Sequence, residues 1–313
     1  MGLDLARPNG AIGDKGLKQQ KTIVVFSSHV VRGTVGLRAA ALALEALGNQ
    51  VWSVPTTILS FHPGHGQPAG FRAETDAFAA LCDSLSASPW VGEIDAVLCG
   101  YFASADQVII ARRFVDAVRD RQSSLDRSPA TLVVDPVLGD HGRLYVPEEV
   151  ARAIGDHLVP MADVLTPNRF ELQWLTDSEE LDDNVKICAS AAQLSRDGTC
   201  DVLVTSAHGL RENSVAALYC SGRKAIAAEH DLMADPPNGL GDLTSALLTH
   251  HMLHDAPLEK RLERTIASVA DVLFKSAKAG CDELALEANL GSLTRPLRPV
   301  HLRQMLLTRP KKR

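Results

Sequence analysis

The residues with the clearest chemical potential are two glycines and an acid in the segment Asn238-Gly239-Leu240-Gly241-Asp242, directly before an apolar run over residues 243–253. Glycine lets backbone N–H groups turn toward a ligand, and the start of a helix adds unpaired donors and the positive end of a dipole. A phosphate suits such a place, whereas the carboxylate of Asp242 would repel it. The best reason for an acid here is that it accepts the proton of an alcohol that is phosphorylated. The alternative is that Asp242 only caps the helix.

Four more motifs precede this segment, and any one of them alone would be a weak signal. In chain order they are Ser28-His29-Val30-Val31 with Gly33 and Gly36, Cys99-Gly100-Tyr101 with Ser104-Ala105, Asp135-Pro136-Val137-Leu138-Gly139-Asp140, and Thr166-Pro167-Asn168 with Glu171. Together with residues 238–242 they occur in an order that resembles the pyridoxal kinases of the ribokinase superfamily. The resemblance runs from about residue 21 to about residue 279, which is most of the chain.

The resemblance implies an α/β fold of the ribokinase-like type, a three-layer sandwich in which helices flank a mostly parallel central sheet. It implies ATP-dependent phosphorylation of the hydroxymethyl group of pyridoxal, which gives pyridoxal 5′-phosphate in vitamin salvage. In that reaction Asp242 would be the catalytic base. The backbone N–H groups of Gly239, Leu240 and Gly241 would form the anion hole.

On the vitamin side, the resemblance implies that Ser28 hydrogen-bonds the substrate ring and that Tyr101 supplies a stacking face. The same comparison implies that a flap over the substrate is lined by Thr56, His62 and Gly64. These five residues are therefore expected to bind pyridoxal together with Asp242.

On the nucleotide side, the resemblance implies that Asp135, Asp140 and Glu171 organise Mg²⁺ and a monovalent cation such as K⁺ around the ATP phosphates, partly through water. Hard cations fit such oxygen ligands. The further ATP-binding residues that the resemblance implies are Thr166, Asn168, Thr205 and Ser206.

Three departures from the family pattern bear on the substrate and on turnover. Leu240 stands where many relatives have threonine, which removes a hydroxyl group from the anion hole and leaves its backbone donors. Arg32 stands where a flap tyrosine is common. The loop over residues 61–66 matches the usual flap sequence only in part.

The elements that must position these residues alternate along the chain. Apolar, β-branched runs over 22–26, 95–99, 131–134, 163–165 and 202–205 predict buried strands, with helical spacing over 35–47, 69–85 and 106–118 between several of them. Residues 215–220 and 224–228 predict a hairpin. Ligands collect at the carboxyl ends of parallel strands, where most of the candidate site residues are expected.

Structural alternatives stay open for several candidates at the strand ends. Asp135-Pro136 could be a turn, and Tyr101 could be ordinary packing. The segment from Thr166 to Glu171 could be a helix start with a capping box.

Length and composition fit one large domain, which the resemblance implies is a kinase domain over residues 21–290, between a flexible extension at 1–20 and a basic, solvated tail at 291–313. The net charge of −6 argues against binding to nucleic acid, and no long uncharged apolar run predicts a membrane span. The six cysteines include no closely spaced pair, which indicates reduced thiols in a cytoplasm. We expect a homodimer.

Other functions remain as alternatives. A hydroxymethylpyrimidine kinase of the same superfamily is the first, and a non-catalytic pyridoxal-phosphate binding protein is the second, although Asp242 argues against a pure binder. A nicotinamide dehydrogenase is disfavoured because the glycine pair comes late and lacks a third glycine. His250, His251 and His254 suggest a metal site, but a solvated helix end is the preferred interpretation.

Overall fold

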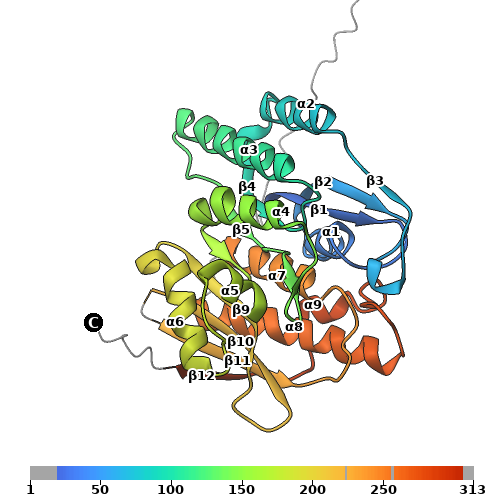
Figure 1. Ribbon diagram of the computed structural model, residues 1–313, viewed down its shortest axis with the longest axis vertical. Helices are drawn as coiled ribbons and strands as arrows, with labels where there is room; N and C mark the ends of the chain where they lie inside the picture. Colours follow the sequence, from blue (N-terminus) through green and yellow to red (C-terminus); the bar gives the residue numbers. More distant parts are fainter. Residues whose placement is uncertain (1–19, 223, 255–256, 306–313) are drawn as a thin grey trace, which may run out of the picture.

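The computed structural model describes residues 20–222, 224–254 and 257–305. Nearly all of the predicted N-terminal extension, and the last residues of the basic tail, lie outside these ranges. Within them, the chain forms one large mixed sheet covered by helices on both faces (Figure 1). The predicted α/β class, with helices on both faces of a central sheet, is confirmed.

The central sheet has the strand order β12-β11-β10-β9-β8-β5-β4-β1-β2-β3. Strands β9, β8, β5, β4, β1 and β2 run parallel to one another, whereas β3 is antiparallel to β2, β10 is antiparallel to β9, and β11 and β12 continue in the antiparallel sense. Their bounds are Thr22–Val30 for β1, Gln50–Leu59 for β2, Gly70–Arg72 for β3, Ile94–Cys99 for β4, Thr131–Val134 for β5, Val164–Leu165 for β8, Asp201–His208 for β9, Ser214–Ser221 for β10, Lys224–Asp231 for β11 and His301–Met305 for β12. A separate small pair consists of β6, Gly139–Asp140, and β7, Arg143–Leu144.

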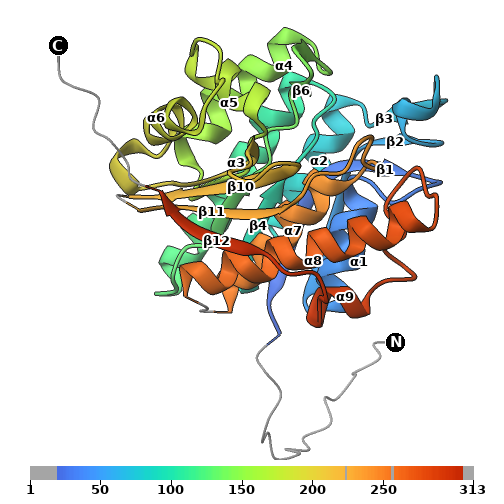
Figure 2. The ribbon, with the colours of Figure 1, turned by 90° about the horizontal axis from the view of Figure 1, so that it is seen from below.

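The helices form a layer on each face of this sheet, which Figure 2 shows from below. One layer contains α1 (Leu37–Ala46), α7 (Leu240–Leu253), α8 (Leu258–Lys278) and α9 (Gly291–Thr294). The other contains α2 (Thr75–Ser86), α3 (Ala105–Ser124), α4 (Glu148–Ala153), α5 (Arg169–Thr176) and α6 (Asn184–Leu194). Short 3₁₀ or π turns occupy Pro63–His65, Val91–Glu93, Ile154–Leu158, Val159–Met161 and Arg196–Gly198. No described helix is long and apolar enough to cross a membrane.

The first strand shows why the sequence forms a sheet with two buried faces. Val24 and Phe26 pack into the core under α2 and α3, whereas Ile23 and Val25 pack into the core under α1 and α7. A strand buried on both sides needs a continuous apolar run, which is what residues 22–26 provide. The strand continues beyond this run to Val30, so the polar Ser27 and Ser28 belong to its carboxyl end.

The structure differs from the sequence-based expectation at two other places. Residues 69–74 are not helical, because Gly70–Arg72 form β3 beside β2, and α2 begins only at Thr75. In the segment expected to be a solvated basic tail, His301–Met305 pair with β11 as an edge strand. Leu302 and Met305 pack against the two cores, which explains why this basic stretch is held on the sheet.

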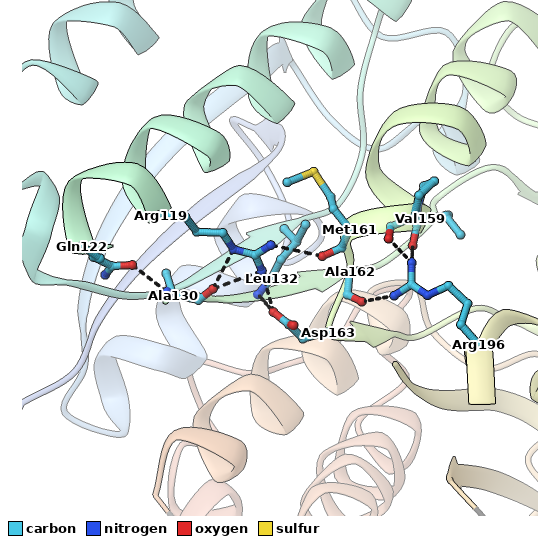
Figure 3. Close-up of polar contacts among 10 residues, drawn as sticks. Arg119, Gln122, Ala130, Leu132, Val159, Met161, Ala162, Asp163 and Arg196 are labelled. Atoms are coloured by element: carbon cyan, nitrogen blue, oxygen red, sulfur yellow. Dashed lines mark hydrogen bonds and ion pairs between the residues drawn. The ribbon is translucent and has the colours of Figure 1, made fainter. Parts of the chain in front are cut away.

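The amino ends of β5 and β8 are tied together by polar side chains (Figure 3). Arg119 donates to the Asp163 carboxylate at 2.7 Å, and the same carboxylate accepts the N–H group of Leu132 at 2.7 Å. Arg196 donates to the carbonyl groups of Val159 at 2.9 Å and Ala162 at 2.7 Å. These contacts satisfy backbone groups at the amino ends of the parallel strands. The predicted site residues lie at the carboxyl ends of the same strands.

Candidate active site

A cavity of about 150 Å³ opens at the carboxyl ends of the central strands. Its walls come from the residues that follow β5 and β8, from β6 and β9, from the start of α5 and from the first turn of α7. The lining residues are Asp135, Val137, Asp140, Tyr145, Thr166, Asn168, Glu171, Thr205, Gly241 and Asp242. All of these except Val137 and Tyr145 are candidates from the sequence. The structure therefore brings the predicted nucleotide, metal and catalytic residues around one space.

The start of α7 has the form expected of an anion site. Gly239 has φ of +103°, and a Cβ atom there would lie 2.5 Å from the carbonyl oxygen of Thr34, so only glycine fits. No side chain caps this helix start, in contrast to α5, which Asn168 caps. The first N–H groups of α7 thus remain available to a ligand.

Asp242 lies in this first turn and reaches beyond its own helix. Its Oδ2 atom accepts the backbone N–H group of Gly36, which precedes α1, at 2.8 Å. Burial raises the pKa of Asp242 to about 6, against the opposing effect of the Gly36 N–H group. A carboxylate with a pKa near neutrality is suited to accept a proton at physiological pH.

Asp135 is the second acid of the cavity and follows β5 directly. Its side chain is buried, and its Oδ2 atom lies 3.8 Å from the position that a Cβ atom would take on Gly241. Burial raises the pKa of Asp135 to about 7, the charge of Asp242 adds to this effect, and the nearby hydroxyl groups of Ser245 and Thr166 oppose it. Asp135 is buried and Asp242 is half-buried, and two acids that repel each other in one cavity favour a cation between or beside them.

Glu171 has the geometry of the capping-box alternative and also lines the cavity. Asn168 caps α5 by accepting the N–H group of Glu171 at 2.9 Å, and Glu171 Oε2 accepts the N–H group of Asn168 at 2.8 Å. Its Oε1 atom accepts the N–H group of Leu138 at 3.0 Å. Burial, and then the charge of Asp135, raise the pKa of Glu171 well above its usual range. Its predicted part in cation binding stays a prediction.

The donor set fits a hard cation that shares its ligands with phosphates and water. Asp135 and Asp140 both line the cavity, together with Thr166. No group of three or more His, Cys, Asp or Glu side chains in the described ranges could hold a metal by itself. Mg²⁺ commonly takes only one or two protein carboxylates beside phosphates and water, so two acids are sufficient.

The remaining nucleotide-side candidates divide into two groups. Thr205, in β9, is half-buried and lines the cavity. Ser206 instead accepts the N–H group of Arg169 at 3.0 Å, so its hydroxyl group helps to hold the start of α5. The role of Ser206 in binding ATP stays a prediction.

The vitamin-side candidates lie around the ends of β1, β2 and β4. Ser28 lies beside Gly36, whose N–H group contacts Asp242, because a Cβ atom on Gly36 would lie 2.6 Å from Ser28 Oγ. Tyr101 is half-buried after β4. Thr56 is fully buried, and its hydroxyl group donates to the Tyr101 carbonyl at 2.8 Å, so Thr56 fixes the backbone that carries this ring.

The loop over residues 61–66, here named the flap loop, carries the other two vitamin-side candidates. His62 Nδ1 accepts the N–H group of Gly64 at 3.2 Å, which closes a 3₁₀ turn over Pro63–His65. His65 Nε2 lies 2.8 Å from Glu283 Oε1. Sequence reasoning missed both Glu283 and Tyr145, because Glu283 lies beyond the matched motifs and Tyr145 lies outside any strand.

The histidines of α7 do not behave as one solvated group. His251 is buried, and burial lowers its pKa to about 4, so the solvated interpretation is wrong for this residue. His250 Nδ1 lies 3.0 Å from Asn49 Nδ2, and His254 Nδ1 lies 2.8 Å from the His250 carbonyl oxygen. These contacts are structural.

Comparison with known proteins assigns this arrangement to a family. The family model described as phosphomethylpyrimidine kinase matches residues 108–285. A pyridoxal kinase of Granulibacter bethesdensis is 33% identical over 269 residues, which cover 84% of this chain and 92% of that relative. A pyridoxine/pyridoxal/pyridoxamine kinase of Bordetella avium is 35% identical over 270 residues, which cover 84% and 88%. The chain belongs to the pyridoxal kinase family.

The solved structures agree with this pyridoxal kinase assignment. A pyridoxal kinase from Leishmania donovani in complex with ADP and pyridoxamine has a TM-score of 0.85 and 26% identity, and the match covers 91% of this chain and all of that one. Among the departures from the family pattern, Leu240 packs against the core under α7 and keeps its backbone donor. Arg32 is exposed and lies 3.7 Å from Asp282.

Proposed function

We propose that this protein is a pyridoxal kinase that uses ATP to phosphorylate the hydroxymethyl group of pyridoxal. The observation that carries the proposal is the position of Asp242. Its carboxylate lies at the uncapped start of α7, is oriented by the Gly36 N–H group, and faces a cavity that Asp135 shares. A base beside a phosphate site is what transfer to an alcohol requires.

In the proposed mechanism, backbone N–H groups stabilise the negative charge of the phosphate and a carboxylate accepts the proton of the substrate. The N–H groups of Gly239, Leu240 and Gly241 bind phosphate oxygens at the start of α7, where the helix dipole favours negative charge. Asp242 orients the substrate hydroxyl group and takes its proton as the new P–O bond forms and the bond to ADP breaks. Alignment of donor and acceptor oxygens supplies most of the acceleration, because little covalent chemistry is demanded of the protein.

The cations of this proposal are Mg²⁺ and a monovalent cation such as K⁺. Asp135 and Asp140 would hold Mg²⁺, with Glu171 acting through water, and the bound cation would offset charge on the ATP phosphates. Asn168, Thr166, Thr205 and Ser206 would complete the nucleotide side. Ser28, Thr56, His62, Gly64 and Tyr101 would form the vitamin side.

A second candidate is a hydroxymethylpyrimidine kinase, because the matching family model is described as phosphomethylpyrimidine kinase, whose substrate is also a pyrimidine. A coupled assay of ATP consumption with pyridoxal, pyridoxine, pyridoxamine and hydroxymethylpyrimidine separates the two. We expect the highest kcat/KM with a vitamin B6 form. Turnover of hydroxymethylpyrimidine alone would establish the second candidate, and binding of pyridoxal phosphate without any turnover would establish a carrier.

The proposal includes a cytoplasmic homodimer. All six cysteines are free thiols, five of them buried, which suits a reducing compartment. Light scattering of the purified protein measures the oligomeric state directly.

A further inference from the structure

Glu283 is a buried carboxylate outside the motifs that define the active site. It follows α8 and is only 6% exposed. Its Oε2 atom accepts the backbone N–H group of Thr34 at 2.5 Å, and its Oε1 atom lies 2.8 Å from His65 Nε2. A Cβ atom on Gly33 would lie 2.0 Å from Oε2, so the backbone of this turn rests directly on the carboxylate.

The turn that Glu283 holds is the same turn that orients the base. We name residues 33–36 the base loop. Within it, the Thr34 carbonyl lies under Gly239 at the anion hole, and the Gly36 N–H group donates to Asp242 at 2.8 Å. A displacement of Thr34 would therefore move both the support of the anion hole and the hydrogen-bond donor of the base.

The backbone around Glu283 is also fixed to the anion hole. The N–H group of Asn238 donates to the Asp282 carbonyl at 3.2 Å, and the N–H group of Leu284 donates to the Asn238 carbonyl at 3.2 Å. Asn238 directly precedes Gly239. Glu283 is thus held in register with the start of α7 while its side chain reaches the base loop.

The flap loop is attached to the same carboxylate through His65. The Nδ1 atom of His65 lies 3.6 Å from Asp282 Oδ2. The ring centroids of His65 and His62 are 6.0 Å apart, in an edge-on arrangement. Glu283 is therefore the common partner of the flap loop on the vitamin side and of the base loop under Asp242.

Resting on the kinase activity proposed above, we propose that Glu283 is a positioning residue that holds the base loop against Asp242 and couples it to the seating of the flap loop through His65. The chemistry needs the substrate oxygen, Asp242 and the phosphate aligned, and a misplacement of about 1 Å can cost roughly a hundredfold in rate. Because one carboxylate contacts both loops, the position of the flap loop over the substrate and the orientation of Asp242 depend on each other.

The test compares Glu283→Ala with Glu283→Gln. Glutamine keeps an oxygen for the Thr34 N–H group and an amide donor for the His65 ring, so we expect its kcat to stay within about threefold of wild type. Alanine removes both contacts, and we expect kcat to fall roughly tenfold or more with little change in the KM for ATP. His65→Ala should raise the KM for pyridoxal, and its effect should be much smaller in the Glu283→Ala background.

Asp282→Asn is the matched control, because Asp282 is the neighbour in sequence and its exposed carboxylate makes, among the described residues, ion pairs of 3.7 Å with Arg32 and 3.6 Å with His65. We expect its kinetics to stay within twofold of wild type. Unchanged kcat in Glu283→Ala would overturn the proposal. Equal losses in Glu283→Ala and Glu283→Gln would also overturn it, because charge and not hydrogen-bond geometry would then be the cause.

Amide hydrogen exchange separates this inference from the proposed function. Exchange over residues 31–36 and 62–66 of the ligand-free protein should be faster in Glu283→Ala than in wild type and unchanged in Asp282→Asn. A wild-type protein without activity on any vitamer would remove the proposed function, and the exchange comparison would still decide whether Glu283 holds the two loops. Identical exchange in wild type and Glu283→Ala would reject the positioning role.

Discussion

At the scale of single residues, the informative fact is that an acid occupies a site built for an anion. Asp242 lies where N–H groups and the helix dipole attract phosphate, and its own charge opposes that attraction. Asparagine would keep the shape and the hydrogen bond from Gly36 without this repulsion. The carboxylate is explained by a proton that must be accepted during transfer.

The first prediction is that Asp242→Asn lowers kcat by roughly a hundredfold or more while nucleotide affinity is kept or improved. The variant loses the proton acceptor but not the anion hole or the cavity. Steady-state kinetics with pyridoxal and a binding titration with a non-hydrolysable ATP analogue measure the two quantities. Near-normal turnover would show that Asp242 is not the base.

The second prediction concerns the pH dependence of kcat/KM. Burial raises the pKa of Asp242 to about 6 and that of Asp135 to about 7. Asp242 accepts a proton only when it is ionised, so kcat/KM for pyridoxal should be highest well above the pKa of this residue and fall as the pH drops through about 6.

The measurement is a profile of kcat/KM from pH 5 to pH 9 at saturating Mg²⁺, in which the residual activity of Asp242→Asn should lose the acidic limb that belongs to this residue. A profile that stays flat down to pH 5 would contradict the assignment of Asp242 as the base.

At the scale of elements, α5 shows that a structural role and a functional role can belong to one side chain. Glu171 completes the capping box of α5 and accepts N–H groups from the loop after β5. The same carboxyl group lines the cavity beside Asp135. Capping geometry therefore does not by itself exclude a part in cation binding.

The third prediction is that Glu171→Ala needs more Mg²⁺ for half-maximal rate and regains part of its activity at high Mg²⁺. Weakening a cation site shifts a binding equilibrium that added metal restores, whereas a missing proton acceptor in Asp242→Asn is not supplied by metal. Loss of the buried acceptor should also destabilise the protein by roughly 1–3 kcal/mol. Mg²⁺ curves identical to wild type would leave Glu171 as a capping residue only.

The elements differ in how far the sequence predicts them. The strands at 131–134 and the hairpin of β10 and β11 follow from apolar runs and a Ser221-Gly222 turn, which are local signals. The edge strand β12 is basic and has few apolar residues, so only its pairing with β11 reveals it. Likewise the contact of Glu283 with Thr34 joins residues 249 positions apart, and no local pattern marks such a pair.

At the scale of the whole molecule, the two edges of the parallel sheet have opposite characters. The amino ends of β5 and β8 are closed by arginine contacts in which the backbone groups are satisfied. The carboxyl ends gather Asp135, Asp242 and Glu171, whose pKa values are all raised by burial. Buried acids of this kind reduce the free energy of unfolding at neutral pH, so the active site costs the fold some of its stability.

The fourth prediction is that Asp135→Asn stabilises the ligand-free protein at pH 8 and does so much less at pH 4.5. In the unfolded chain an aspartate titrates near pH 4, as a rough reference. Folding raises the pKa of Asp135 to about 7, so the native state holds a proton that the unfolded state releases between these two values. The stability that this protonated carboxyl group gives is present at low pH and is lost as the pH rises through 7.

Asparagine has no charge to bury. The substitution also removes the repulsion between the carboxylates of residues 135 and 242. We therefore expect the free energy of unfolding at pH 8 to exceed that of wild type by about 2 kcal/mol. Denaturant unfolding in the presence of EDTA measures this difference at both pH values. Asp120→Asn, which changes an exposed carboxylate on α3, is the control and should show no such pH-dependent difference. A variant that is destabilised equally at both pH values would mean that Asp135 is held by contacts that outweigh the cost of burying its charge.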